Sequence, residues 1–150
     1  MAGVKRLRGE YFHTIDKKGR MSIPAKFRET FGDMLMMAKG PNHCLYFYPI
    51  EEWEKAEEKV LNAENSSTPQ GKFLIRNFIG GSQDVEIDAM GRVLVPQSLR
   101  EFAGLTDKMD VVVVGVGSKA EVWPKAHWAE TMEEDSKILD YDQCLSDFGL

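Results

Sequence analysis

The sequence of 150 residues lacks the features that define several classes of protein. Only two cysteines are present, at positions 44 and 144, too few for the disulfide framework of a small secreted domain. No apolar run approaches the roughly 18 residues of a membrane-spanning helix, and the first residues hold no apolar segment typical of a secretory signal. We therefore expect a cytoplasmic protein with reduced thiols and no membrane partner.

Patterns of catalytic and metal-binding residues are also missing. The histidines at positions 13, 43 and 127 do not have the spacing of metal ligands, and the glycine-rich stretches lack the rest of a phosphate-loop signature. The many carboxylates include no pair that stands out as an acid and a base. We expect no catalytic residue, no metal site and no cofactor, so the protein is not predicted to be an enzyme.

The net charge of −5 conceals an uneven distribution along the chain. Residues 1–30 carry eight basic and three acidic side chains, a net charge of +5, which leaves −10 for the other 120 residues. From residue 130 onward, seven acidic side chains accompany a single lysine, Lys137. A basic segment on an acidic protein indicates a polyanion partner such as nucleic acid, and the alternative is ordinary solvated surface charge.

A repeat divides the chain into two halves. Residues 16–29, DKKGRMSIPAKFRE, return as residues 88–101, DAMGRVLVPQSLRE, at an offset of 72. Asp, Gly, Arg, Pro, Arg and Glu are identical at matching positions. A second similarity follows at an offset of 75 and relates Tyr48-Pro49-x-x-x-Trp53 to Trp123-Pro124-x-x-x-Trp128. Two similarities in the same order indicate an internal duplication.

The first half is predicted to open with a β-hairpin. Alternating residues 10–15 and the returning residues 20–23 are expected to pair around a turn at residues 16–19. Pro24 then starts a short helix at residues 25–31. A second strand pair, residues 34–38 and 44–48, leads to a helix at residues 50–62.

In the helix at residues 50–62, Glu51 and Lys55 have the spacing of an ion pair. Residues 70–78 are predicted to be helical, and the last ten residues to be loosely ordered. The second half is predicted to repeat the first, with strands at residues 82–87, 92–95, 109–116 and 120–123 and helices at residues 96–102 and 125–139.

The Asp-x-x-Gly-Arg turn is the most specific chemical feature of the repeat. Asp16 is placed to accept backbone N–H groups, and Gly19 supplies a positive φ. One interpretation is a structural ion pair of Asp16 with Arg20 that fixes the hairpin. The other is that the hairpin presents Arg20, with Lys17 and Lys18, to a phosphate backbone or to the major groove, which admits a two-stranded ribbon. The two roles are compatible if Asp16 orients Arg20.

The segment RGEYFHTIDKKGRMSIPAKFR, residues 8–28, resembles the start of proteins of the MraZ family. The second Asp88-x-x-x-Arg92, the LYFYP segment before Trp53 and the EVWP segment at residues 121–124 also resemble that family. The similarity covers nearly all of residues 8–145. The family comprises bacterial transcriptional regulators related to the AbrB/SpoVT DNA-binding family.

The resemblance implies an α+β fold of two tandem AbrB-like swapped-hairpin β-barrel half-domains that form a pseudo-dimer within one chain. The expected boundaries are residues 8–53 and 81–128 for the half-domains, 54–80 for connecting helices, and 129–150 for a C-terminal helix and acidic tail. It also implies a ring-shaped homo-oligomer, an octamer or dodecamer in the family. The implied function is sequence-specific binding of double-stranded DNA, at short direct repeats upstream of the protein's own division and cell-wall gene cluster. The expected location is the cytoplasm, in association with the nucleoid.

The same resemblance assigns DNA binding to the basic residues of the first hairpin, which are Lys17, Lys18 and Arg20. Residues 1–7 extend the usual start of the family, so Lys5 and Arg6 form an added phosphate-binding arm or an alternative start, and Arg8 is a further candidate. The second hairpin has Ala89-Met90 where the first has Lys17-Lys18. We therefore expect the second hairpin to be mainly architectural, with Asp88 and Arg92 as a structural pair. The structural residues predicted for the two motifs are Asp16, Gly19, Asp88, Gly91 and Arg92.

A second class of function stays open, a protein-interaction or scaffolding ring of antitoxin type in which the hairpins serve only assembly. The swapped-hairpin fold hosts both uses, so the fold alone does not decide between them. The three tryptophans, Trp53, Trp123 and Trp128, are candidates either for contacts between subunits or for the core.

Overall fold

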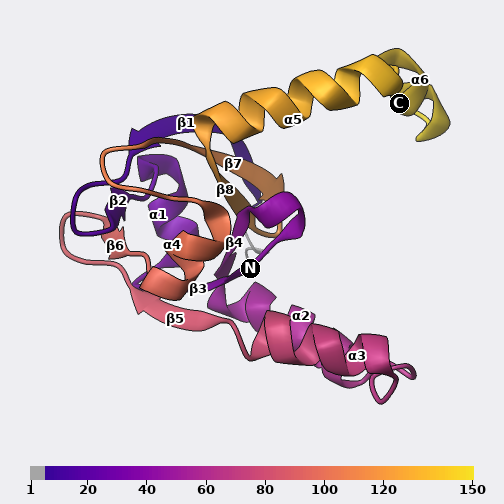
Figure 1. Cartoon of the computed structure of the whole chain (residues 1–150), viewed down its shortest axis with the longest axis horizontal. Coiled ribbons are helices and arrows are strands. Elements are labelled where there is room, and N and C mark those ends of the chain that lie inside the picture. Colours follow the sequence, from indigo (N-terminus) through magenta and orange to yellow (C-terminus); the bar gives the residue numbers. More distant parts are fainter. Residues whose placement is uncertain (1–5) are drawn as a thin grey trace.

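The structure is a computed structural model that describes residues 6–150 (Figure 1). Both halves of the chain form the same series of elements, as the repeat predicts. The first half contains β1 (Leu7–Thr14), β2 (Arg20–Ser22), α1 (Ala25–Phe31), β3 (Met34–Lys39), β4 (Leu45–Pro49) and α2 (Ile50–Leu61). The second half contains β5 (Gln83–Glu86), β6 (Arg92–Leu94), α4 (Gln97–Ala103), β7 (Asp110–Gly117), β8 (Ala120–Pro124) and α5 (Lys125–Ile138). The fold is α+β.

Short segments outside this series connect and follow the two halves. A 3-10 turn, η1 (Pro41–His43), joins β3 to β4, and α3 (Pro69–Leu74) continues into the π-helical segment η2 (Ile75–Ile79) between the halves. The chain ends with α6 (Tyr141–Asp147), so the expectation of a loosely ordered end is wrong. The Asp140 side chain accepts a hydrogen bond from the backbone N–H of Asp142 at 3.1 Å and caps this helix.

The strands form two antiparallel sheets whose pairing crosses between the halves. The larger sheet has the order β1-β7-β8-β4-β3-β5, and β2 pairs with β6 in a separate two-stranded sheet. The local hairpin predicted from the sequence is wrong, because β1 pairs along its length with β7 and β2 pairs with β6. The backbone N–H of Ile15 donates to the backbone carbonyl of Met109 at 2.9 Å. This bond extends the pairing of β1 with the second half up to the turn. The turn therefore joins strands of two different sheets.

Two reciprocal hydrogen bonds, one at each turn, connect the turns to the opposite halves of the chain. The N–H of Val95 donates to the carbonyl of Gly19 at 2.9 Å, and the N–H of Ile23 donates to the carbonyl of Gly91 at 2.8 Å. Residues 23 and 95 are equivalent in the repeat, as are residues 19 and 91. The two halves therefore interlock with an approximate two-fold relation at the β2–β6 pair.

The main core is built from equivalent positions of both halves. Its members include Met21, Ile23 and Phe27 of the first half and their equivalents Val93, Val95 and Leu99, each exposed by 2% or less. Tyr11 packs edge-on against Phe27, with ring centroids 5.2 Å apart. Because one cluster contains side chains from both halves, each half depends on the other to bury its apolar residues.

The second similarity in the sequence also marks a repeated local structure. Pro49 and Pro124 precede α2 and α5 with nearly equal backbone angles, φ of −58° and −57°. Tyr48 and Trp53 form an edge-to-face pair with centroids 5.3 Å apart, and Trp123 and Trp128 form the equivalent pair at 5.4 Å. Trp53 and Trp123 are only 3% and 2% exposed, so they pack within the chain rather than against a neighbouring subunit.

Two helical arms project from the sheets on the side away from β2 and β6 (Figure 1). One contains α2, α3 and η2, and the other contains α5 and α6. In α2, Lys55 pairs with Glu52 at 3.1 Å instead of with Glu51. None of the helices within residues 6–150 is long and apolar enough to cross a membrane.

The shared core predicts that the two halves unfold together. Replacing the fully buried Leu99 with alanine leaves a cavity, and we expect a loss of about 2–5 kcal/mol in the free energy of unfolding. The same truncation at Leu139, which is 57% exposed, serves as the control and should change stability by less than about 0.5 kcal/mol. Denaturant unfolding followed by circular dichroism should give one transition that moves as a whole. Two transitions, of which Leu99→Ala moves only one, would show independent halves.

Candidate nucleic-acid interface

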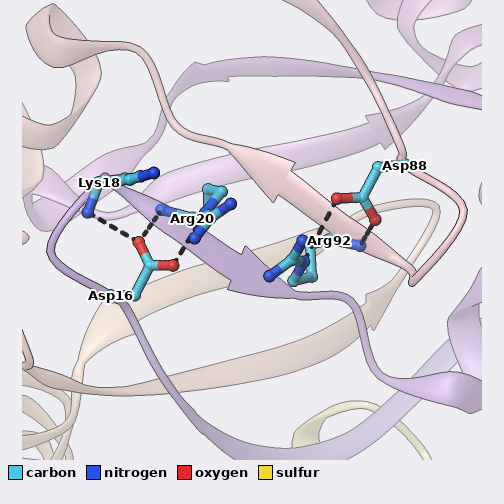
Figure 2. A network of polar contacts seen from close by, with 5 residues as sticks. All are labelled: Asp16, Lys18, Arg20, Asp88 and Arg92. Atoms are coloured by element: carbon cyan, nitrogen blue, oxygen red, sulfur yellow. Dashed lines mark hydrogen bonds and ion pairs between the residues drawn. The ribbon is translucent and has the colours of Figure 1, made fainter.

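The first Asp-x-x-Gly-Arg turn is held by the side chain of its aspartate (Figure 2). Asp16 Oδ1 accepts hydrogen bonds from the backbone N–H of Lys18 at 2.8 Å and of Arg20 at 2.9 Å. Its second oxygen, Oδ2, accepts from Arg20 Nε at 2.9 Å. Gly19 has a φ of 87°, the left-handed region in which glycine is favoured. One carboxylate therefore fixes both the backbone of the turn and the direction of the arginine.

The second turn repeats this arrangement. Asp88 Oδ1 accepts from the backbone N–H of Met90 and of Arg92, both at 2.9 Å, and Oδ2 accepts from Arg92 Nε at 3.3 Å. Gly91 has a φ of 78°. The structural ion pair expected from the sequence is thus formed in both turns.

These hydrogen bonds lower the pKa of both aspartates. The backbone N–H of Arg20 is the main cause of the lowered pKa of Asp16, and the backbone N–H of Arg92 is the main cause at Asp88. Both carboxylates are therefore ionised at neutral pH. Each ion pair engages Nε of the arginine, and within residues 6–150 no hydrogen bond engages the two terminal nitrogens of either guanidinium. Those terminal nitrogens are the donors needed for a ligand.

The β2–β6 pair places the two arginines on one ribbon. The register aligns Arg20 with Leu94, Met21 with Val93, and Ser22 with Arg92. Met21 and Val93 are 1% exposed and point into the core, so the alternating residues form the outer face. This outer face consists of Arg20, Ser22, Arg92 and Leu94. Figure 2 shows the two arginines next to each other, with Asp16 and Asp88 on the outside.

A second pair of arginines packs against the turns, and neither is among the site residues predicted from the sequence. Arg28 Nε donates to the carbonyl of Ile23 at 3.2 Å, and its equivalent Arg100 donates to Val95 at 2.9 Å. A Cβ at Gly19 would come within 2.8 Å of Arg100 Nε, and one at Gly91 would collide with the guanidinium of Arg28. Each turn therefore lies on an arginine of the opposite half. The signal in the sequence was that residues 28 and 100 are identical and equivalent in the repeat.

The remaining basic candidates lie in different places. Lys17 and Lys18 are exposed at the first turn, beside Arg20. Arg6 and Arg8 do not lie on the ribbon, because they flank the start of β1 and line a cleft of about 550 Å³ together with Lys26. Lys5 lies outside the described residues.

The histidines bind to backbone carbonyls. His43 Nδ1 lies 3.0 Å from the carbonyl of Phe102, and His127 Nε2 lies 2.8 Å from that of Asn42. In the part of the chain that the structure describes, no three His, Cys, Asp or Glu side chains gather in a group that could hold a metal ion.

The outer face of the ribbon has the chemistry of a polyanion-binding surface. A two-stranded ribbon fits the major groove, where arginine can bind O6 and N7 of guanine through two hydrogen bonds. The aspartates fix the arginines before binding, which reduces the entropy lost when they contact a ligand. Exposed lysines at the tip are suited to phosphate groups.

The causes of the lowered pKa values predict how each aspartate responds to loss of its arginine side chain. In Arg20→Ala, the pKa of Asp16 should rise but stay below its ordinary value, because the backbone N–H of residue 20 remains. The pKa of Asp88 should not change. Carboxyl carbon chemical shifts in a pH titration measure both values.

The same lowered pKa values make the stability of the folded protein depend on pH. A lowered pKa in the folded state means that these aspartates stabilise the fold above the ordinary aspartate pKa of about 3.9, and that this contribution is lost as the pH falls through the folded-state pKa. An ordinary pKa for Asp16 in the unsubstituted protein would contradict the geometry described here.

Comparison with known proteins identifies the family. The profile of the family described as "MraZ protein, putative antitoxin-like" matches residues 7–77 and again residues 78–143. A protein of Desulfitobacterium hafniense strain Y51, named "Transcriptional regulator MraZ", is 48% identical over 122 residues, which are 81% of this chain and 83% of the relative. Proteins of the same name from Moorella thermoacetica and Lachnoclostridium phytofermentans are each 41% identical. Those matches cover 89% and 95% of this chain and 97% and 96% of the relatives. With two consecutive matches to one family and these relatives along nearly the whole chain, the chain belongs to the MraZ family.

Proposed function

We propose that this protein is a transcriptional regulator that binds double-stranded DNA sequence-specifically, with the β2–β6 ribbon in the major groove. The observation that carries the proposal is the outer face of the ribbon, on which Arg20 and Arg92 lie together with their terminal nitrogens directed to no partner among the described residues. The names of the relatives support the regulatory part of the proposal.

The proposal gives the basic residues different tasks. Arg20 binds a guanine edge, and Lys17 and Lys18 at the tip of the turn bind phosphates. Arg92 has the same geometry as Arg20, which favours a base or phosphate contact for it in addition to the structural role predicted from the sequence. Arg6, Arg8 and Lys5 provide outer phosphate contacts. Asp16, Gly19, Asp88 and Gly91 hold the turns.

The arrangement of charge supports DNA binding by a protein whose net charge is −5. The acidic residues of α5 and α6 lie on an arm that projects away from β2 and β6 (Figure 1). Repulsion between solvent-exposed charges is screened over about 8 Å at physiological ionic strength, so acidic residues on a projecting arm oppose DNA binding at the ribbon less than their number suggests. Binding to DNA therefore depends on the local basic face rather than on the net charge.

The proposal extends to a ring-shaped homo-oligomer, an octamer or dodecamer, which binds short direct repeats upstream of the protein's own division and cell-wall gene cluster. The two helical arms support self-association, since they expose apolar residues such as Phe73, Ile138 and Tyr141, which are 69%, 80% and 75% exposed. Several ribbons on one ring would bind several repeats at once and gain affinity from their high effective concentration. Such an assembly would associate with the nucleoid.

Within this proposal, the halves are tandem swapped-hairpin barrels at residues 8–53 and 81–128, with connecting helices at 54–80 and a C-terminal helix and tail at 129–150. The exchange of partners by β1 and β2 supports the swapped arrangement. The alternative function is a protein-interaction or scaffolding ring of antitoxin type, which the description of the family also suggests. In that case the ribbon would serve assembly and no DNA sequence would be preferred.

Loss of the Arg20 side chain separates the two functions. Arg20→Ala should weaken binding to the duplex upstream of the protein's own gene by about 5- to 150-fold, the cost of one two-bonded base contact. Its oligomeric mass should not change. Fluorescence anisotropy with a scrambled duplex for comparison, at several salt concentrations, measures both affinity and specificity.

Arg76→Ala is the matched control. Arg76 is an exposed arginine of η2, which belongs with α2 and α3 to the helical arm that projects away from β2 and β6 (Figure 1). It should leave affinity unchanged. If the unsubstituted protein binds both duplexes equally at physiological salt, sequence-specific regulation at that site is wrong. If Arg20→Ala dissociates the oligomer instead, the ribbon serves assembly.

A further inference from the structure

The two ends of the β2–β6 ribbon differ chemically although their backbones are equivalent. Arg20 lies opposite Leu94, whereas Arg92 lies opposite Ser22, and residues 22 and 94 are equivalent in the repeat. The duplication has therefore kept the arginine and changed the residue across from it. One arginine has an apolar neighbour and the other has a hydroxyl.

Leu94 is exposed at a position where the rest of the outer face is polar. Its exposed fraction is 53%, while its neighbours in sequence, Val93 and Val95, are 1% and 0% exposed and belong to the core. Leu94 is not needed to fill the core, so its place in the ribbon is open to another function. Isolated surface leucines are common, but this one lies directly across from the arginine proposed to bind a base.

The spacing of the ribbon brings Leu94 to the same part of the groove as Arg20. Residues directly opposite in an antiparallel pair have Cβ atoms about 4.5–5.5 Å apart. Successive base pairs are about 3.4 Å apart along the helix axis. Two opposite side chains that enter the groove together therefore reach the same base pair or adjacent ones.

The major groove offers one apolar group on its base edges, the C5-methyl group of thymine. An apolar side chain gains free energy by covering that methyl and gains nothing from the polar edges of guanine, cytosine or adenine. Ser22 can donate to or accept from several bases, so it gives no comparable preference.

We propose that Leu94 is a specificity-determining residue that packs on the C5-methyl group of a thymine in a base pair next to the one that Arg20 contacts. The inference rests on the proposed function, because it requires the ribbon to enter the major groove. It adds that the two ends of the ribbon recognise different bases. The end with Arg20 and Leu94 requires a thymine methyl, and the end with Arg92 and Ser22 does not.

The test uses duplexes that the unsubstituted protein selects from a random pool, so that no operator has to be assumed. Each selected duplex is made twice, once with thymine and once with deoxyuridine, which pairs identically and lacks only the methyl group. We expect the substitution to weaken binding by the unsubstituted protein roughly fourfold per site, the effect of burying one methyl group. Scanning single replacements should locate the effect at one thymine beside a guanine.

The protein variants show whether Leu94 senses the methyl. Leu94→Ala should bind the thymine and deoxyuridine duplexes with nearly equal affinity, and its thermal unfolding should match that of the unsubstituted protein. Met90→Ala is the control, since Met90 is 68% exposed at the second turn and should leave the preference for thymine unchanged. Ser22→Leu should create a new preference for thymine at the other end of the site.

The outcomes separate this inference from the proposed function. If no duplex is selected over the random pool, the proposed function fails and the inference fails with it. If duplexes are selected but the unsubstituted protein ignores the methyl group, or Leu94→Ala keeps the same preference, only the inference is wrong. A change of oligomeric mass in Leu94→Ala with the preference intact would make Leu94 a protein contact, which also overturns it.

Discussion

The pairing of β2 with β6 is the interaction on which the rest of the structure depends. Three residues of each half form this ladder, and the hydrogen bonds from Val95 to Gly19 and from Ile23 to Gly91 close it at both ends. It buries Met21 and Val93 at the centre of a core that neither half can complete. It also places Arg20 and Arg92, 72 positions apart in the sequence, on one face. A change that opens this ladder would disturb the core and the basic face together.

The duplicated halves share the residues that hold the two turns but differ in the side chains on their surface. The residues identical in both turns form the frame: the aspartates accept the backbone hydrogen bonds, the glycines permit the turns, and Arg28 and Arg100 support the turn of the opposite half. The surface residues differ between the halves: exposed Lys17-Lys18 stands against exposed Ala89-Met90, and half-buried Ser22 stands against exposed Leu94. A frame with approximate two-fold symmetry therefore presents a chemically asymmetric surface, which suits an asymmetric DNA site better than a palindrome.

Local sequence signals predicted most of the elements and the geometry of the turns. The hydrogen bonds of Asp16 and the positive φ of Gly19 follow from residues close together in the chain, and so do the starts of α2 and α5 after Pro49 and Pro124. The partners of β1 and β2 could not be predicted in this way, because a tight turn between two strands usually gives a hairpin, and the core shared by both halves overrides it. The contact between each turn and an arginine of the other half is equally non-local. The helix at Tyr141–Asp147 was missed because its seven residues bury no side chain and give little apolar periodicity.

Methylation of guanine in the bound duplex shows whether the ribbon binds DNA in the major groove. Dimethyl sulfate methylates N7 of guanine in the major groove and N3 of adenine in the minor groove, so protection of each atom reports which groove is occupied. The bound protein should protect N7 of a guanine in the duplex while adenine N3 stays reactive, and Arg20→Ala should expose that guanine again. Protection of adenine N3 alone, or full reactivity of every guanine in a saturated complex, would contradict binding of the ribbon in the major groove.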